Sequence, residues 1–428
     1  MSKYAIKDWS PADFFELCTW FGERWFQEFP ALSLWTCKWR PEDLIPGLSD
    51  LDARVICDEI GPEDWVRLDE LAYRTHLEIT QARPEWARKL EHTPGVCSTK
   101  SEVLDDALFQ PEMRTWDYYW GDRELFNQIK EFIQHRGWGP VDEYYFLAKR
   151  FVPWCTPYNR EIDPPINIPV NILPKYALHS RVMHYFVPCI KAALAVINRD
   201  GVTGKRESLY RWAQIFPKEP VLHEVIHMLD VHYEVPWLED EQEWYAFEER
   251  LWQFIQKITP EVLRAVTIVD LGRDLTMDNL RRKLKEFPGE PMMTLYNGVR
   301  FSRIRKGRWM FYLNAPSFFD TGHVCYWEIS WLASTFTTPL FDAYAQIKWK
   351  ERGLPLDEIL NRMTPDLIDQ REGQVIRQVF AAAAGKPTEA EARERLRQAT
   401  EVYADYYLIL ERMLADARQT MAAEGKRE

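Results

Sequence analysis

The sequence predicts an α+β protein in which a short mixed sheet with flanking helices is followed by a mainly helical C-terminal region. Two observations support this fold class. Strand-like runs concentrate in the N-terminal part of the chain, whereas helical spacing of apolar residues dominates from about residue 175 onward. With 428 residues, of which 46% are hydrophobic, the chain is long enough for two or three domains with substantial cores.

The first elements are expected in the order helix, strand, loop, strand, helix. A helix is predicted at 11–28, where Pro11 opens a broad apolar stripe. Alternation predicts a strand at 31–36, a loop containing proline and glycine follows, and an apolar run predicts a second strand that includes Asp50. Apolar residues then recur at helical intervals over 65–82.

The later part of the chain contains a strand, a hairpin and several helices by the same criteria. Residues 113–120 are rich in strand formers and lead into an amphipathic helix. A β-hairpin is expected at 294–314, with Arg305-Lys306-Gly307-Arg308 at its turn, and the tail 387–424 indicates one long helix. Prolines concentrated at 153–174 mark a boundary. Three regions are therefore expected: a first domain at 1–155, a helical domain at 175–290 that completes the substrate cleft, and a hairpin plus helices at 291–428.

The composition narrows the expected partners. A net charge of −12 and a pI near 5.4 disfavour non-specific binding to nucleic acid or to an anionic membrane, and fit a neutral or cationic small-molecule substrate. No apolar run reaches the length of a membrane span, and the start Met1-Ser2-Lys3-Tyr4 lacks an apolar signal core. Seven cysteines without a CxxC motif indicate reduced thiols, so a cytoplasmic location is expected.

Ser49-Asp50-Leu51-Asp52 is the most informative motif. Two carboxylates one residue apart on a strand point to the same face, because side chains alternate with a period of two. Carboxylates held so close are costly unless a cation lies between them, and a hard divalent ion with oxygen ligands meets that need. Asp50 and Asp52 are therefore expected to bind Mg²⁺.

Together with the elements on either side, this motif resembles the signature of the nucleotidyltransferase superfamily typified by DNA polymerase β, and especially its small-molecule, aminoglycoside-type members. In that family a Gly-Ser pair ends the first strand, and a Ser-Asp-x-Asp strand follows a loop. Here Ser49 and the two aspartates match, and Arg40 stands in the place of an arginine common in the loop. Thr36-Cys37 departs from the Gly-Ser pair, whose glycine makes close backbone approach to the phosphates easy.

The resemblance implies a nucleotidyltransferase fold, a two-metal Mg²⁺ site and a nucleoside triphosphate as co-substrate. Asp50 and Asp52 would hold metal, and a third carboxylate would complete the site or act as general base. Glu91 is favoured for that role over Glu78, because Glu78 falls within the helical periodicity that ends near residue 82. Further possibilities are Asp117 and Glu102.

The resemblance also implies a set of nucleotide contacts. A lysine after the helix hairpin of the second domain can approach the triphosphate in small-molecule nucleotidyltransferases, and Lys205 follows such an apolar helix here. A solvated lysine at a helix start is the alternative. The expected nucleotide-binding residues are Thr36, Cys37, Arg40, Ser49 and Lys205.

His223-Glu224-Val225-Ile226-His227 is a literal HExxH match and offers a rival hypothesis, a zinc metalloprotease. On a helix the two imidazoles share a face and can bind Zn²⁺, with Glu224 as general base. The common third-ligand spacings fit poorly, because Ala246 and Phe247 lie 19 and 20 residues after His227. Ordinary residues on a packed helix are the favoured interpretation of both histidines.

The expected hairpin carries a run of basic residues. They indicate either a surface that grips phosphates or RNA or a solvated strand face, and the net negative charge favours the solvated face. These residues are Arg300, Arg303, Arg305, Lys306 and Arg308.

The expected reaction is Mg²⁺-dependent transfer of a nucleoside monophosphate, AMP from ATP in the first instance, to a small-molecule acceptor in antibiotic modification or biosynthesis. One alternative is a nucleotidyltransferase that acts on tRNA or protein. Another is a degenerate, non-catalytic nucleotide-binding member, which the Thr36-Cys37 departure would suit.

Overall fold

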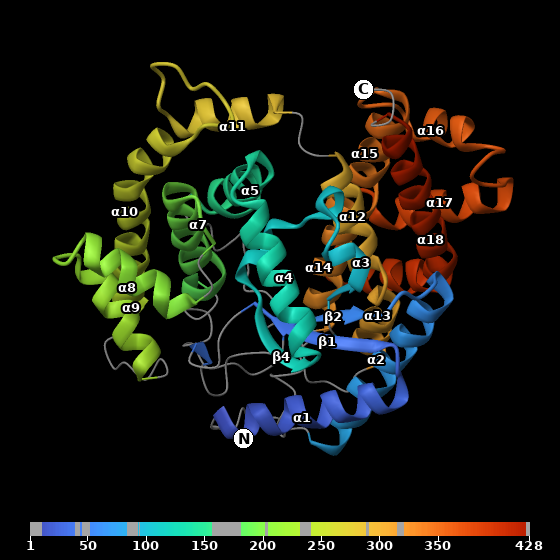
Figure 1. Cartoon of the computed structure of the whole chain (residues 1–428), viewed down its shortest axis with the longest axis horizontal. Helices are drawn as coiled ribbons and strands as arrows, with labels where there is room; N and C mark the ends of the chain where they lie inside the picture. The colour runs from blue at the N-terminus through green and yellow to red at the C-terminus, as the bar shows by residue number, and fades with distance from the viewer. Residues whose placement is uncertain are drawn as a thin grey trace.

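The computed structural model describes residues 11–38, 43–44, 52–83, 93, 95–155, 181–201, 204–231, 241–287, 291–314 and 321–424. Within these ranges the chain is α+β, with one four-stranded sheet near the N-terminus and helices thereafter, as the sequence predicts (Figure 1). None of the helices in these ranges is long and apolar enough to cross a membrane.

The first part of the chain holds the sheet and the helices that cover it. Its strands are β1 (Leu32–Cys37), β2 (Ala53–Cys57), β3 (Val96–Thr99) and β4 (Asp117–Gly121). Its α-helices are α1 (Pro11–Glu28), α2 (Pro62–Ala82), α3 (Lys100–Val103), α4 (Arg123–Arg136) and α5 (Pro140–Tyr144). Short 3₁₀ segments are η3 (Asp106–Leu108), η4 (Pro111–Thr115) and η6 (Val152–Trp154), and η5 (Tyr145–Phe151) is a π-helix.

The described residues beyond 180 are helical or form connections between helices. One group comprises the π-helix η7 (Arg181–Phe186), α7 (Val187–Asn198), α8 (Lys205–Ile215), α9 (Pro220–Asp230), α10 (Glu241–Ala265) and α11 (Met277–Glu286). The other comprises α12 (Pro291–Ser302), α13 (Arg305–Asn314), α14 (Thr321–Trp331), the π-helix η9 (Leu332–Phe336), α15 (Thr338–Trp349), α16 (Leu356–Met363), α17 (Gln370–Ala383) and α18 (Glu389–Glu424).

The sheet has the order β3-β2-β1-β4 and is mixed. β1 pairs antiparallel with β2 and β4, whereas β2 and β3 run parallel. Because side chains alternate along a strand, Leu34 and Ile56 face α4, while Trp35 and Val55 face the core shared with α1 and α2. Both faces of the sheet are therefore covered.

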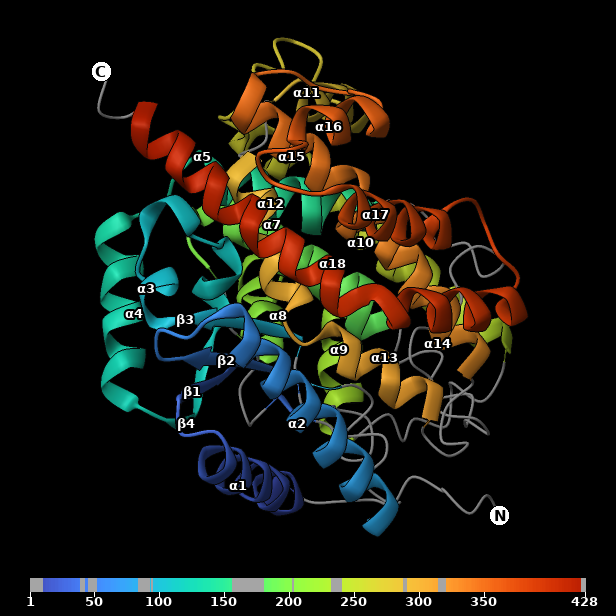
Figure 2. The ribbon, with the colours of Figure 1, turned by 90° about the vertical axis from the view of Figure 1, so that its right-hand side faces the viewer.

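Two large hydrophobic cores organise the helices. One unites α1, α2 and the sheet with α12 to α18, so the N-terminal and C-terminal parts of the chain share a single core. The other lies within residues 146–284 and is built from η5, η7 and α7 to α11. Figure 1 shows this second group at the opposite side of the molecule from α15 to α18, and Figure 2 shows α18 crossing the C-terminal helices.

The predicted hairpin at 294–314 is wrong, because α12 and α13 occupy these residues. Met292, Leu295 and Val299 are buried at helical spacing, which the strand-forming residues around them obscured. Gly307 serves close packing rather than a turn. A Cβ atom there would come within 2.4 Å of the carbonyl oxygen of Asp69 in α2.

Two strand boundaries also differ from the prediction. β2 begins at Ala53, so Asp52 precedes the strand, while Asp50 lies outside the described residues. The predicted strand at 113–120 divides into the 3₁₀ segment η4 and β4. The predicted helices at 11–28 and 65–82 and the predicted strand at 31–36 are confirmed to within a few residues.

Candidate functional site

One edge of the sheet gathers the end of β1 and the starts of the other three strands. Cys37 at the end of β1 pairs with Ala53 at the start of β2 and with Asp117 at the start of β4. Since β3 runs parallel to β2 and pairs Val96 with Arg54, it starts at the same edge. Polar groups that flank these four positions are thus brought together, whatever their separation in sequence.

Asp52 is the member of the predicted metal set that the structure describes at this edge. Its carboxylate accepts from both terminal nitrogens of Arg54, and the bond from Nη2 is 3.3 Å long. The pair follows from strand alternation, because residues 52 and 54 point the same way. Asp50 and Glu91, and the predicted nucleotide contacts Arg40 and Ser49, lie outside the described residues.

Thr36 and Cys37 are both fully buried. The Cys37 thiol lies 3.2 Å from the carbonyl oxygen of Asp52, and its side chain belongs to the core of α1 and α2. Thr36 points to the opposite face, where its hydroxyl has no hydrogen-bond partner among the described residues. Of the two predicted contacts, only Thr36 therefore lies on the face that carries Arg54, its cross-strand partner.

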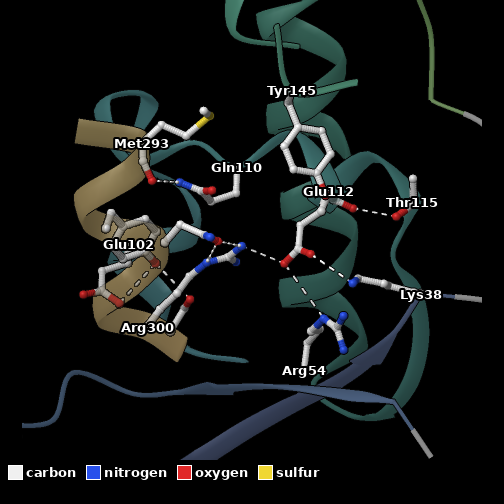
Figure 3. A network of polar contacts seen from close by, with 12 residues as sticks. Lys38, Arg54, Glu102, Gln110, Glu112, Thr115, Tyr145, Met293 and Arg300 are labelled. Carbon is white, nitrogen blue, oxygen red and sulfur yellow. Dashed lines mark hydrogen bonds and ion pairs between the residues drawn. The ribbon is translucent and has the colours of Figure 1, made fainter. Parts of the chain in front are cut away.

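Glu112 of η4 is the centre of the polar network on this face (Figure 3). Its carboxylate accepts from Arg300 of α12 at 2.7 Å and lies 3.4 Å from the Lys38 ammonium and 3.9 Å from Nε of Arg54. Burial alone would raise the pKa of Glu112, but the neighbouring cations, Arg300 foremost, outweigh it and hold that pKa below its usual range. Glu112 is therefore a permanently ionised anchor for cations from three segments.

Burial destabilises the charged form of two lysines in this cluster. Burial, with the nearby Arg54, lowers the pKa of Lys38 to about 8 against the opposing attraction of Glu112. Burial also lowers the pKa of Lys191 in α7 to about 8, opposed mainly by Asp43. Burial therefore makes both ammonium groups less stable here than in water.

Arg150 joins the network from η5. Its guanidinium donates to the Tyr145 hydroxyl, with nitrogen–oxygen distances of 2.8 and 3.1 Å, and the charges of Glu112 and Arg54 act on it. Both residues lie on a π-helix, a rare element that is frequent at functional sites because the wider turn redirects side chains.

The sheet-edge cluster contains more positive than negative charge among the described residues. Six cationic side chains interact electrostatically here with three carboxylates. The cations are Lys38, Arg54, Arg150, Lys191, Lys205 and Arg300, and the carboxylates are Asp43, Asp52 and Glu112. Thr36 Oγ1 and Arg54 Nε are both buried without a hydrogen-bond partner in the described ranges, so the cluster also holds unused donors.

Lys205, the predicted triphosphate contact, starts α8 beside this cluster. Its backbone N–H and that of Arg206 donate to the buried Asp43 carboxylate at 2.7 and 2.9 Å. A carboxylate is favourable there because helix N-termini attract negative charge. The side chain of Lys205 contributes to the positive potential at Lys191.

The other three candidates for the third carboxylate are Glu78, Glu102 and Asp117. Glu78 is on the outer side of α2 and pairs with Arg24 at 2.7 Å, so it does not reach the sheet edge. Glu102 is buried against Arg303. Asp117 does lie at the edge, opposite Cys37. Within the described ranges no three His, Cys, Asp or Glu side chains gather as metal ligands.

Three of the five basic residues at 300–308 form buried ion pairs with other helices. Arg303 pairs with Glu102 and with Glu411 of α18, the latter at 2.7 Å, while Arg305 and Arg308 both pair with Glu328 of α14 at 3.1 and 2.8 Å. These four arginines, Arg300 included, are buried, so the expectation of a solvated or RNA-gripping strand face is wrong for them. Lys306 instead lines a cavity of about 620 Å³ between α13 and α18.

Most of the cluster was not predicted from the sequence, although one signal was present. Alternation places Lys38 beside Thr36 and Arg54 beside Asp52 on one face. Glu112, Arg150 and Lys191 carry no comparable signal, because η4, η5 and α7 meet only through the tertiary fold.

No family model, curated protein or solved structure matches this chain. The function must therefore be argued from the site.

Proposed function

We propose that this protein is a Mg²⁺-dependent nucleotidyltransferase that binds a nucleoside triphosphate at the sheet-edge cluster and transfers the nucleoside monophosphate to a small-molecule acceptor. One observation carries the proposal. Cationic side chains outnumber carboxylates in the described part of this cluster, directly beside Asp52. A triphosphate carries the negative charge that binds to such a group of cations.

The arrangement of the strands supports the metal part of the proposal. Asp52 immediately precedes β2, and β3 starts beside it in parallel. In the sequence, Asp50 and Glu91 come shortly before these two strand starts. Asp50, Asp52 and Glu91 are the residues proposed to hold Mg²⁺, which would neutralise charge on the attacking and leaving oxygens during in-line displacement. A carboxylate has about four acceptor sites, so Asp52 retains capacity beside Arg54.

The chain's own residues then have separate roles. Lys38, Arg150 and Lys191 bind and orient the phosphates, because they approach the cluster from three sides, just after the end of β1, on η5 and on α7. Thr36 contributes its unused hydroxyl as a donor. Arg54 and Arg300 are positioning residues, since Glu112 and Asp52 already hold them. Glu91 is proposed to take the proton from the acceptor hydroxyl.

The proposed acceptor is a small molecule. The net charge of −12 disfavours RNA, and four of the five basic residues at 300–308 are buried in ion pairs rather than available to a phosphate backbone. ATP is proposed as the first nucleotide to test, and a cytoplasmic location accords with seven buried cysteines that form no disulfide bond in the structure.

A second candidate is a nucleotide-binding protein without transferase activity. Two observations favour it. The Cys37 side chain is packed into the core where the family has its Gly-Ser pair, and Asp52 is engaged by Arg54. Both candidates predict triphosphate binding, and only the first predicts turnover.

Pyrophosphate release tests the proposal. The wild-type protein is incubated with Mg²⁺, each of the four ribonucleoside triphosphates and a panel of small hydroxyl compounds, beside Asp52→Asn and the control Lys257→Met. Lys257 is an exposed residue of α10 that pairs with Glu219. Acceptor-dependent release by the wild type and Lys257→Met, lost in Asp52→Asn, is expected. Triphosphate binding without release identifies the non-catalytic candidate, and absence of binding refutes both.

A further inference from the structure

The two histidines of the HExxH motif have no part in the proposed reaction, yet the structure presents them together. His223 and His227 are both exposed on α9, one turn apart. Residues four apart on a helix share a face and have Cβ atoms about 5–6 Å apart. Two imidazoles at this spacing can bind one metal ion between them.

The backbone that carries the pair is held in place. The opposite side of α9 is buried in the core of the helical region, so the helix does not have to form when a metal binds. The ordering cost of binding is then limited to the two side chains. The buried residues are Val221, Leu222, Val225, Met228 and Leu229.

The contact of His223 sets its tautomer. Nε2 lies 3.2 Å from the carbonyl oxygen of Pro217, which can only accept a hydrogen bond. Nε2 therefore carries the proton and Nδ1 carries the lone pair. Metal-binding histidines commonly donate their second N–H to a carbonyl oxygen in this way.

Glu224 does not act with the histidines. Its carboxylate accepts from Nε of Arg250 in α10 at 3.1 Å, so it is directed toward the neighbouring helix and its charge is compensated. No third His, Cys, Asp or Glu joins the pair in the described part of the chain. The geometry therefore gives no support to peptide hydrolysis and leaves two nitrogen ligands on the exposed face of α9.

We propose that His223 and His227 form a two-nitrogen chelate for a late first-row divalent ion, Zn²⁺, Cu²⁺ or Ni²⁺, on the outer face of α9. Imidazole nitrogen suits these ions, whereas Mg²⁺ prefers oxygen ligands. The site is thus chemically distinct from the Mg²⁺ site proposed at the sheet edge, and it does not depend on that proposal.

Calorimetric titration of Ni²⁺ into the untagged, metal-free full chain tests the chelate. The variants are His223→Ala, His227→Ala and the double substitution, with His135→Ala as a matched control, since His135 is also exposed and lies on the last turn of α4. Either single substitution is expected to weaken the site about tenfold or more, and the double substitution to abolish it. His135→Ala and millimolar Mg²⁺ are expected to change nothing at this site.

Two results would overturn the proposal. Equal Ni²⁺ affinity in the wild type and both single variants would show that the pair is not the site. Loss in one single variant alone would show binding by one imidazole instead of a chelate. Both histidines are exposed, and circular dichroism checks that each variant remains folded.

Discussion

Two polar networks in this molecule pair basic side chains with carboxylates. They differ in the ratio of cations to carboxylates. In the network of residues 303–308, Arg303, Arg305 and Arg308 face Glu102, Glu328 and Glu411, three cations against three carboxylates. In the sheet-edge cluster, six cations meet three carboxylates among the described residues. Equal numbers of cations and carboxylates compensate one another, whereas an excess of cations is stabilised by an anionic ligand. The comparison separates a structural network from a binding site.

Breaking the balanced network should have the largest effect on folding. Arg303→Met leaves the buried Glu102 and the partly buried Glu411 without their shared partner, and is expected to lower the free energy of unfolding by about 3–5 kcal/mol. Added tripolyphosphate should not restore the loss, because the unpaired groups are negative. Urea denaturation with and without the anion measures this. A loss below about 1 kcal/mol would mean that the network is not structural.

Removing the central carboxylate of the sheet-edge cluster should give a smaller loss that an anion repairs. Glu112→Gln removes the negative charge that compensates Arg300, Lys38 and Arg54. It is expected to lower the free energy of unfolding by about 3 kcal/mol. Tripolyphosphate should recover much of that stability, since it replaces the lost charge. The same urea experiment applies, and equal losses with and without the anion would contradict an anion site.

The pH dependence should show opposite signs for binding and for stability. Lys38 and Lys191 have pKa values near 8 against an ordinary 10.5. Between pH 8 and 10.5 the unfolded chain thus binds more protons than the folded one, so these lysines make the free energy of unfolding rise with pH. Anion affinity should fall across the same range, by up to about tenfold per lysine between pH 7 and 9, because an anion binds the protonated form.

Calorimetry and denaturation at pH 7, 8 and 9 measure both trends, with Lys38→Met and Lys191→Met as variants in which each trend is reduced. An affinity that is independent of pH in the wild type would mean that neither lysine contacts the anion.

The smallest effect is expected at Thr36. Its hydroxyl is buried without a partner in the described ranges, so Thr36→Val should leave stability unchanged or raise it by about 1 kcal/mol. Tripolyphosphate affinity should fall by less than tenfold as one donor is removed. Thermal denaturation and calorimetry report the two quantities, and a loss of stability would show that the hydroxyl has a structural role.

The sequence predicts the local elements of this fold better than its tertiary contacts. The helices at 11–28 and 62–82 and the strand at 32–37 follow from spacing and alternation, because each buries one face against a core. The hairpin prediction within the segment 291–314 was wrong because the aromatic and β-branched residues of this segment favour strands in isolation. Burial against α2, α15 and α18 selects helices instead. Tertiary packing overrides propensity there.

The sequence predicts only the part of the candidate site whose residues lie close together along the chain. Ser49-Asp50-Leu51-Asp52 directs attention to the start of β2, which proves to be the edge where all four strands meet. Glu112, Arg150 and Lys191 could not be assigned, because their elements converge only in the folded chain. Arg300 was recognised as a phosphate-binding candidate on a strand, and the structure places it on a helix as the partner of Glu112.

The central claim is that the excess of cations over carboxylates among the described residues of the sheet edge makes it a phosphate-binding site. Calorimetric titration of tripolyphosphate into the wild-type chain, the double variant Lys38→Met/Lys191→Met and the control Lys257→Met tests it most directly. One saturable anion per chain is expected for the wild type and the control, with affinity at least about tenfold lower in the double variant. Absence of saturable binding, or equal affinity in all three proteins, would contradict the claim.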